Sequence, residues 1–316
     1  MMEEKINIAF LPGGAGNAIN AIKVYSTFDN IHTYALDSDE NSAGLKLANR
    51  GFLVSKFEDE GFLEELIGII KNYNIDILLP DLDEAESFLS DNYSDLSKFT
   101  NIIISPPETI KITRDKWLTY NHLKDFIPMP KSYININEID CEYPLIIKPR
   151  ISSGSKSVFK LDCDSDLEYY FNKLSNPIIQ EYLDGKEYTV DCFSANGNLV
   201  FAVPRLRIRT KDGIVTIAKI EYNKILENIA HIIASKLKFN GPFFFQVKES
   251  FTSDLKVTEI GARMSGGMIL SYYAGADIYT SILKLHKNEI IAKPVIDYGL
   301  MMTRYWEEYY YHETRI

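Results

Sequence analysis

The stretch Glu259-Ile-Gly-Ala-Arg263 follows the strand-like run Phe243-Phe-Phe-Gln246-Val247, and the short polar segment Ser250-Phe-Thr-Ser-Asp254 lies between two extended runs. Extended runs joined by a few polar residues are typical of a β-hairpin. We therefore expect a hairpin whose second strand ends in a carboxylate, two small residues and a cation.

A turn centred on Thr252 and Ser253 pairs Gln246 directly with Glu259. Opposed side chains on one face of a sheet lie roughly 5 Å apart, so one Mg²⁺ can contact both. Hard cations take oxygen ligands, and Arg263 adds a planar set of donors for phosphate or carboxylate. Taken alone, this pattern favours an ordinary hairpin with solvated charges.

A second hairpin is expected upstream. Residues 143–149, which end in Lys148-Pro149, read as an apolar strand, and the loop at 151–157 contains Ser153-Gly154-Ser155 before another strand at 158–161. Hydroxyl and backbone N–H groups in such a flap can close over phosphates, with the lysine as a point charge beneath. One glycine and a few serines also make a plain surface turn.

The segment Pro177–Asp191 reads as strand, connector, strand. An extended connector offers free backbone groups that can pair with the edge of an adenine, and Glu187 can accept from ribose hydroxyls or approach a metal. Alone, it is better explained as a strand pair with exposed acids.

The order and spacing of these segments resemble the ATP-grasp superfamily, in particular the branch similar to half of the carbamoyl phosphate synthetase large subunit, biotin carboxylase and the amino-acid ligases. The resemblance covers nearly the whole chain, and it is carried by Arg114-Asp-Lys116, Pro144-Leu-Ile-Ile-Lys148-Pro, Gln180-Glu-Tyr-Leu183, Lys186-Glu-Tyr188, Phe245-Gln-Val247 and Glu259-Ile-Gly-Ala-Arg263.

The resemblance implies ATP and Mg²⁺, or Mn²⁺ in its place, as the bound groups. It assigns Lys116, Lys148, Ser153, Gly154 and Ser155 to the phosphates, Glu181, Tyr182 and Leu183 to the adenine, Glu187 to the ribose or the metal region, Gln246 and Glu259 to the metal, and Arg263 to the acyl phosphate.

Two positions depart from the family pattern. The family often has an asparagine two residues after the second metal-binding glutamate, where this chain has Gly261. Some amino-acid ligases resemble this chain at that point, so the departure changes the expected substrate more than it argues against activity. The flap also has a single glycine, Gly154, where several members have a run.

The expected fold class is α/β, with an N-terminal parallel-sheet, Rossmann-like domain at 1–108, a small flap subdomain at 109–182 and a C-terminal antiparallel α+β subdomain at 183–316. Strands ending at Leu11, Asp37 and Asp81 alternate with helices, which indicates a parallel sheet. Asp81, Asp83 and Glu84 follow the end of a strand, where they either bind a substrate amine or start a helix.

The first turn also permits a dinucleotide-binding interpretation. Gly14 and Gly16 are followed about twenty residues later by Asp37, in the manner of a nicotinamide fingerprint. The third glycine position holds Ile19, so this is the minor interpretation. It leaves a non-catalytic nucleotide-binding module as an alternative.

Four further elements are expected downstream. Residues 109–126 and 268–286 are predicted helices, 224–237 an amphipathic helix, and 298–311 an aromatic strand. Arg205, Arg207 and Arg209 alternate along another strand, so we expect them on one face. The set suits an anionic substrate group or guards a sheet edge. We favour a catalytic role for Arg207, because Glu187 and Asp191 lie on the expected neighbouring strand.

The composition limits the partners. With 316 residues, 46% hydrophobic, the chain can bury a large core, and its net charge of −10 disfavours nucleic acid and anionic membranes. Three cysteines without CxxC spacing fit reducing cytoplasm, no apolar run reaches the roughly 18 residues of a membrane span, and the N-terminus lacks a signal-peptide layout.

The expected activity is ATP-dependent ligation of a small carboxylate to a small amine, both amino-acid-like, through an acyl phosphate with release of ADP and phosphate. An enzyme that activates bicarbonate, as carboxylases and carbamoyl phosphate synthetases do, is the alternative. A homodimer is compatible with the chain.

Overall fold

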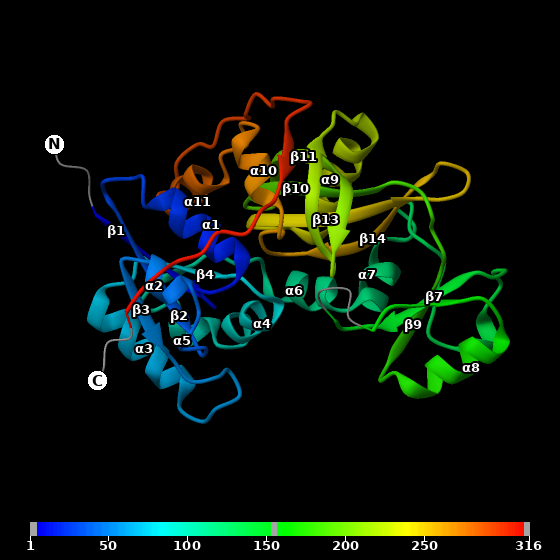
Figure 1. Ribbon diagram of the computed structural model, residues 1–316, viewed down its shortest axis with the longest axis horizontal. Coiled ribbons are helices and arrows are strands. Elements are labelled where there is room, and N and C mark those ends of the chain that lie inside the picture. Colours follow the sequence, from blue (N-terminus) through cyan, green and yellow to red (C-terminus); the bar gives the residue numbers. More distant parts are fainter. Residues whose placement is uncertain (1–4, 153–156, 313–316) are drawn as a thin grey trace.

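The computed structural model describes residues 5–152 and 157–312. Its elements form three sheets, one after another along the chain, with helices packed around them (Figure 1). Each of the three segments expected from the sequence contains one sheet. The boundaries after residues 108 and 182 remain a prediction.

The first sheet is parallel, in the order β3-β2-β1-β4-β5. Its strands are β1 (Ile6–Leu11), β2 (Ile31–Asp37), β3 (Arg50–Leu53), β4 (Ile77–Pro80) and β5 (Asn101–Ile102), and its helices are α1 (Gly16–Tyr25), α2 (Gly44–Leu47), α3 (Phe62–Tyr73), α4 (Asp83–Asp91) and α5 (Tyr93–Leu96). Apolar side chains of β1 enter both large hydrophobic cores, Leu11 with α3 and Phe10 with α1, so helices cover both faces.

The second sheet is small, in the order β6-β9-β7-β8, and has its own hydrophobic core. It consists of β6 (Ser132–Tyr133), β7 (Leu145–Pro149), β8 (Phe159–Leu161) and β9 (Pro177–Glu181), with α8 (Asp164–Lys173) packed against it and a 3₁₀ turn at Ile136–Glu138. The separate core makes this sheet a distinct lobe, which lies away from the first sheet in Figure 1.

The third sheet is antiparallel, in the order β14-β13-β10-β11-β12-β15. It contains β10 (Glu187–Ala195), β11 (Asn198–Lys211), β12 (Ile214–Ile220), β13 (Gly241–Glu249), β14 (Leu255–Gly261) and β15 (Met301–Thr303), and it is accompanied by α9 (Lys224–Leu237), α10 (Met268–Tyr273) and α11 (Ile278–His286). The predicted α/β class is confirmed, and α9 has the predicted bounds.

Three predicted elements are wrong in extent. The helix expected at 109–126 is two helices, α6 (Pro107–Arg114) and α7 (Lys116–Leu123), because Asp115 is extended and its carboxylate caps α7. The helix expected at 268–286 breaks between α10 and α11, where Asp277 caps α11 and Gly275 has φ = 105°. Of the strand expected at 298–311, only Met301–Thr303 pairs, with β12, and it forms the edge of the sheet.

Candidate functional site

The hairpin of β13 and β14 pairs Gln246 with Glu259, as predicted. The loop, however, is centred on Thr252 rather than between Thr252 and Ser253, since Glu249 pairs with Leu255. A β-bulge between Gln246 and Val247 takes up the extra residue and restores the expected pairing. The predicted register at the metal pair is confirmed, and it results from a loop and a bulge that compensate each other.

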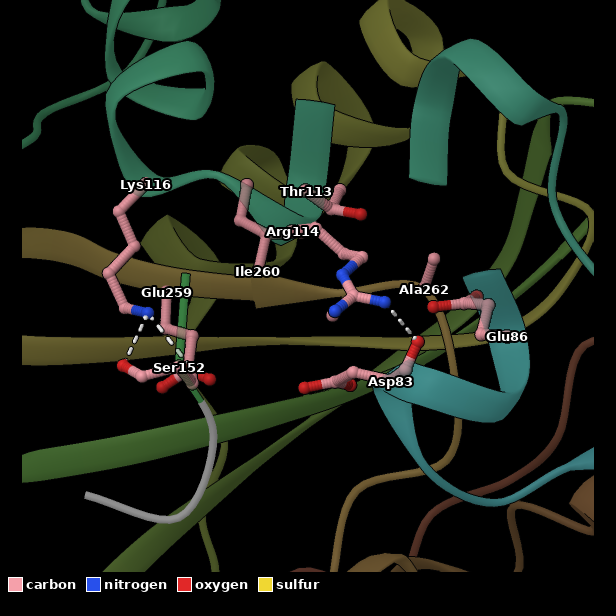
Figure 2. A pocket seen from close by; sticks show the side chains of 10 residues that line it. Asp83, Glu86, Thr113, Arg114, Lys116, Ser152, Glu259, Ile260 and Ala262 are labelled. Carbon is pink, nitrogen blue, oxygen red and sulfur yellow. Dashed lines mark hydrogen bonds between the residues drawn. The ribbon is translucent and has the colours of Figure 1, made fainter. Parts of the chain in front are cut away.

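Two lysines lie beside this pair. Lys116 begins α7 and Lys148 lies in β7, and burial followed by the charge of Lys116 lowers the pKa of Lys148 to about 8, although Glu259 and Glu187 oppose the shift. The Lys116 ammonium donates to the carbonyl and hydroxyl of Ser152 at 3.0 and 3.3 Å (Figure 2). Within the described part of the chain neither lysine forms an ion pair, so their charge is available to an anion.

A cavity of about 180 Å³, here called the lysine cavity, contains these groups. Of the residues predicted from the sequence, it is lined by Lys116, Lys148, Glu181, Leu183, Glu187, Gln246 and Glu259, with Ser152 at its edge. Tyr182 is not in the lining; its ring faces the ammonium groups of Lys160 and Lys248 at 5.4 and 5.5 Å. Ser153, Gly154 and Ser155 fall outside the described residues.

The carboxylate of Glu181 is engaged within the protein. It forms an ion pair with Lys256 and accepts from the backbone N–H of Lys131 at 3.1 Å. Its side chain therefore fixes the strand β9 against the hairpin, and its backbone remains the part suited to an adenine edge.

A second cavity of about 290 Å³, here called the arginine cavity, shares Gln246 and Glu259 with the first. Arg205, Arg207, Arg263 and Arg304 line it, together with Asp81 and the loop Ser265–Gly267. Arg207 pairs with Glu187 at 3.2 Å, and Arg263 donates to Asp83 at 2.5 Å. Gln246 and Glu259 thus form a wall with cations on both sides.

The expectation that Arg205, Arg207 and Arg209 share one face holds for Arg205 and Arg207, which both line the arginine cavity, and is wrong for Arg209. Arg205 is 1% exposed and donates to Asp191, while irregular pairing with β12 after Arg207 leaves Arg209 exposed. Arg205 is therefore structural, because its guanidinium is matched by a buried carboxylate of the next strand.

An acid cluster at the end of β4 supports Arg263. Asp83 also accepts at its backbone oxygen from Arg114, at 2.8 Å (Figure 2), whereas Glu84 is exposed. Glu86, one turn after Asp83, was missed by the sequence reasoning, although its i+3 spacing from Asp83 was an available signal.

Glu86 makes a pH-dependent prediction possible. Burial, then the charge of Asp83, raises the pKa of Glu86 from 4.5 to about 8. Between pH 4.5 and about 8 the folded protein keeps the proton on Glu86, whereas the unfolded chain loses it. The free energy of unfolding therefore falls as the pH rises through this range. Glu86→Gln should gain about 3–4 kcal/mol relative to wild type between pH 5 and 8.

Urea denaturation at pH 5, 6.5 and 8 measures this difference. Glu84→Gln is the matched control, since this residue lies on the same helix and is exposed. A constant difference between Glu86→Gln and wild type across the range contradicts the prediction.

The packing of Phe244 explains why residue 261 is a glycine. A Cβ added there would lie 2.4 Å from Cε1 of Phe244, and Phe244 is buried with the Arg263 guanidinium 5.4 Å from its ring centroid. An asparagine at this position therefore displaces the ring, so Gly261 and Phe244 are a matched pair.

Gly261→Ala should lower the free energy of unfolding by about 1–3 kcal/mol, because the ring must move within a packed core. Gly266→Ala is the control, since a Cβ there meets nothing within 4 Å. Guanidinium chloride denaturation compares the two variants, and equal stability would refute the steric account.

Asp37, the acid of the dinucleotide-binding interpretation, is bound within the protein. Asp37 is buried and accepts from the N–H of Gly14 at 2.7 Å, from Ser42 at 3.1 Å and from the N–H of Asp39 at 3.0 Å. These bonds close the first turn, so the carboxylate is committed to the fold rather than directed to a ribose.

The donor set fits Mg²⁺. No cluster of three or more His, Cys, Asp and Glu suited to a metal occurs in residues 5–152 and 157–312. The Gln246–Glu259 pair offers one carboxylate and one amide group. Mg²⁺ is commonly held by one or two carboxylates and takes its other ligands from phosphates and water. Glu259 and Gln246, beside two lysines, meet this requirement.

Two family models match separate parts of the chain. Residues 173–306 match the family described as ATP-grasp in the biosynthetic pathway with Ter operon, and residues 9–104 match the PylC-like N-terminal domain. The resemblance to the ATP-grasp superfamily that was expected from the sequence is confirmed by the family match of residues 173–306, and the similar proteins support an ATP-dependent ligase.

Two curated relatives are similar in sequence. A D-alanine–D-alanine ligase of Petrotoga mobilis is 34% identical over 113 residues, which cover 34% of this chain and only 38% of the ligase. A carbamoyl-phosphate synthase of Methanobrevibacter smithii is 22% identical over 273 residues, 79% of this chain and 72% of the synthase.

Two solved structures share the fold. One is the biotin carboxylase domain of Hydrogenobacter thermophilus 2-oxoglutarate carboxylase, in complex with MgADP, ADP and bicarbonate. It has a TM-score of 0.76 at 12% identity, and the match covers 95% of this chain and 74% of the carboxylase chain. The structure of N5-carboxyaminoimidazole synthetase of Staphylococcus aureus, complexed with ADP, has a TM-score of 0.73 at 18% identity. The match covers 93% of this chain and 81% of the synthetase chain.

No helix in the described part of the chain is both long and apolar enough to cross a membrane.

Proposed function

We propose that the protein is a MgATP-dependent ligase that joins a small carboxylate to an amine and releases ADP and phosphate. The observation that carries this proposal is the wall of Gln246 and Glu259, shared by a cavity with two lysines and a cavity with four arginines. A phosphoryl donor on one side and an acceptor on the other meet at this wall. The ligases and ADP complexes among the similar proteins support the assignment.

In this proposal the lysine cavity holds ATP. Lys116 and Lys148 offset phosphate charge, the segment Glu181–Leu183 supports the adenine and Glu187 faces the ribose. Mg²⁺, held by Glu259 and Gln246, would neutralise charge on the transferring phosphoryl group. Catalysis then consists mainly of positioning and charge neutralisation.

The reaction needs no nucleophilic side chain. A carboxylate oxygen of the substrate attacks the γ-phosphorus and the bond to the ADP oxygen breaks, which gives an acyl phosphate. The amine nitrogen then attacks the acyl carbon, phosphate leaves with the C–O bond electrons, and the nitrogen loses a proton. Arg263 and Arg207 hold the acyl phosphate and its oxyanion, and closure of the cavity limits hydrolysis.

A second candidate is activation of bicarbonate. The carbamoyl-phosphate synthase match extends over 273 residues, farther along the chain than the D-alanine–D-alanine ligase match. The same ATP site would serve, with bicarbonate in place of the organic carboxylate. We also place the protein in the cytoplasm, which fits three free cysteines, and a homodimer is compatible with this proposal.

Phosphate release from ATP, measured across amino acids, small carboxylates and bicarbonate and followed by mass spectrometry of products, tests the proposal. ADP formation that requires a carboxylate together with an amine supports ligation, and ADP formation with bicarbonate alone supports the second candidate. AMP with pyrophosphate overturns the mechanism. A thermal shift seen with NAD and not with MgATP would instead support a non-catalytic binding module.

A further inference from the structure

The arginine cavity contains one arginine that forms no ion pair in the described part of the chain. Three of its four arginines already face a carboxylate: Arg205 with Asp191, Arg207 with Glu187 and Arg263 with Asp83. Arg304 forms no ion pair with any residue in the described ranges, and its guanidinium donates to the backbone oxygen of Gly266. Burial and the nearby charge of Arg205 lower the pKa of Arg304, so an anion placed beside it relieves repulsion.

The same cavity contains a buried acid that forms no ion pair with any described residue. Asp81 is 1% exposed; its Oδ2 accepts from the N–H of Ala18 at 2.8 Å, and its Oδ1 has no hydrogen-bond partner in the structure. Arg263 is near, but its Nε is bound to Asp83. A buried carboxyl oxygen without a donor is costly, and a ligand that brings an N–H group removes this cost.

Arg304 is supplied by the C-terminal segment 304–312, here called the strap. The strap leaves β15 and crosses α1 and α2 of the first domain (Figure 1). Glu307 forms an ion pair with Lys23 of α1, and the Lys46 ammonium lies 5.1 Å from the centroid of the Tyr311 ring. The strap therefore joins the third sheet to the first domain beside the cavity.

We propose that the arginine cavity binds an amine substrate that also carries an anionic group, with its ammonium at Asp81 and its anionic group at Arg304. This inference rests on the proposed function and adds the substrate class and direction of binding. Arg304 is then a specificity-determining residue, because the remaining arginines are neutralised by the protein. A carboxylate and a phosphate share the chemistry that Arg304 recognises.

Binding is measured by thermal shift with a non-hydrolysable ATP analogue and Mg²⁺ present. The probes are the twenty amino acids, O-phosphoethanolamine, and amines without an anionic group, namely ethanolamine, cadaverine and agmatine. Wild type should be stabilised by one of the first two classes and not by the third. A response to amino acids alone identifies a carboxylate, and a response to O-phosphoethanolamine alone identifies a phosphate.

Three variants test the assignment. Arg304→Gln and Asp81→Asn should each weaken binding of the responding probe by at least about tenfold, as loss of a charged partner does, with affinity for the ATP analogue unchanged. Arg304→Lys should restore part of the affinity. Arg209→Gln, an exposed arginine of β11, is the matched control and should bind as wild type does.

The outcomes separate this inference from the proposed function. It is overturned if no probe stabilises wild type, if amines without an anionic group bind equally well, or if Arg304→Gln binds as wild type does. In turnover, Arg304→Gln should raise KM for the amine with little change in kcat, which a merely structural role does not produce. Probe binding, combined with no ADP formation from ATP when the probe is paired with every carboxylate of the panel and with bicarbonate, refutes ligation and retains the binding mode.

Discussion

Glu259→Gln should lower ADP formation by about a hundredfold to a thousandfold, since one preorganised electrostatic contact to the transition state is typically worth that much. Glu259 is the single carboxylate of the Gln246–Glu259 pair and lines both cavities. The substitution keeps the shape of the side chain and removes its charge, so the protein should stay folded while its affinity for Mg²⁺ falls.

Asp254→Asn is the matched control, because it makes the same change of charge at the exposed turn of the same hairpin. Phosphate release at increasing MgCl₂ measures the effect. Partial recovery of Glu259→Gln at high Mg²⁺ is expected, and turnover equal to that of Asp254→Asn would remove Glu259 from the metal site.

Arg205→Met should lower the free energy of unfolding by about 3–5 kcal/mol, the usual cost of leaving one partner of a buried ion pair alone. Asp191, which is 0% exposed, accepts from Arg205 at 3.1 Å and from the hydroxyls of Ser265 and Ser271 at 2.5 and 2.6 Å. Without Arg205 its charge has no compensating cation in the core.

Guanidinium chloride denaturation compares Arg205→Met with Arg209→Met, whose side chain is exposed on the same strand. The double variant Arg205→Met, Asp191→Leu should recover part of the loss, since replacing both members of a buried pair by apolar groups is often neutral. A loss below about 1 kcal/mol in the single variant, the range of exposed pairs, would contradict a buried ion pair.

The sequence was sufficient to predict the pairing of Gln246 with Glu259, because that arrangement is local. Side chains alternate along a strand with a period of two, so a short loop limits which residues face each other. Gln246 and Glu259 are thirteen residues apart and were placed opposite each other correctly. The compensating bulge was not visible, since no glycine marks it.

Errors arose where distant contacts decide the local structure. The break at Asp115 depends on its capping bonds to α7 and on Arg150, thirty-five residues later, whose guanidinium holds the carboxylate. Arg205 was expected to serve an anionic substrate group or to guard a sheet edge, because its partner Asp191 becomes a diagonal neighbour only once the register of β10 and β11 is known. Neither contact has a signal in the nearby sequence.

The wall of Gln246 and Glu259 also has a pharmacological consequence. One compound that carries a phosphate mimic in the lysine cavity and a zwitterionic end in the arginine cavity would span both compartments across this narrow partition. Such a bisubstrate inhibitor loses its translational freedom once while gaining the contacts of two ligands. The linker length that gives the tightest binding would then indicate the distance between the phosphate position in the lysine cavity and the substrate position in the arginine cavity.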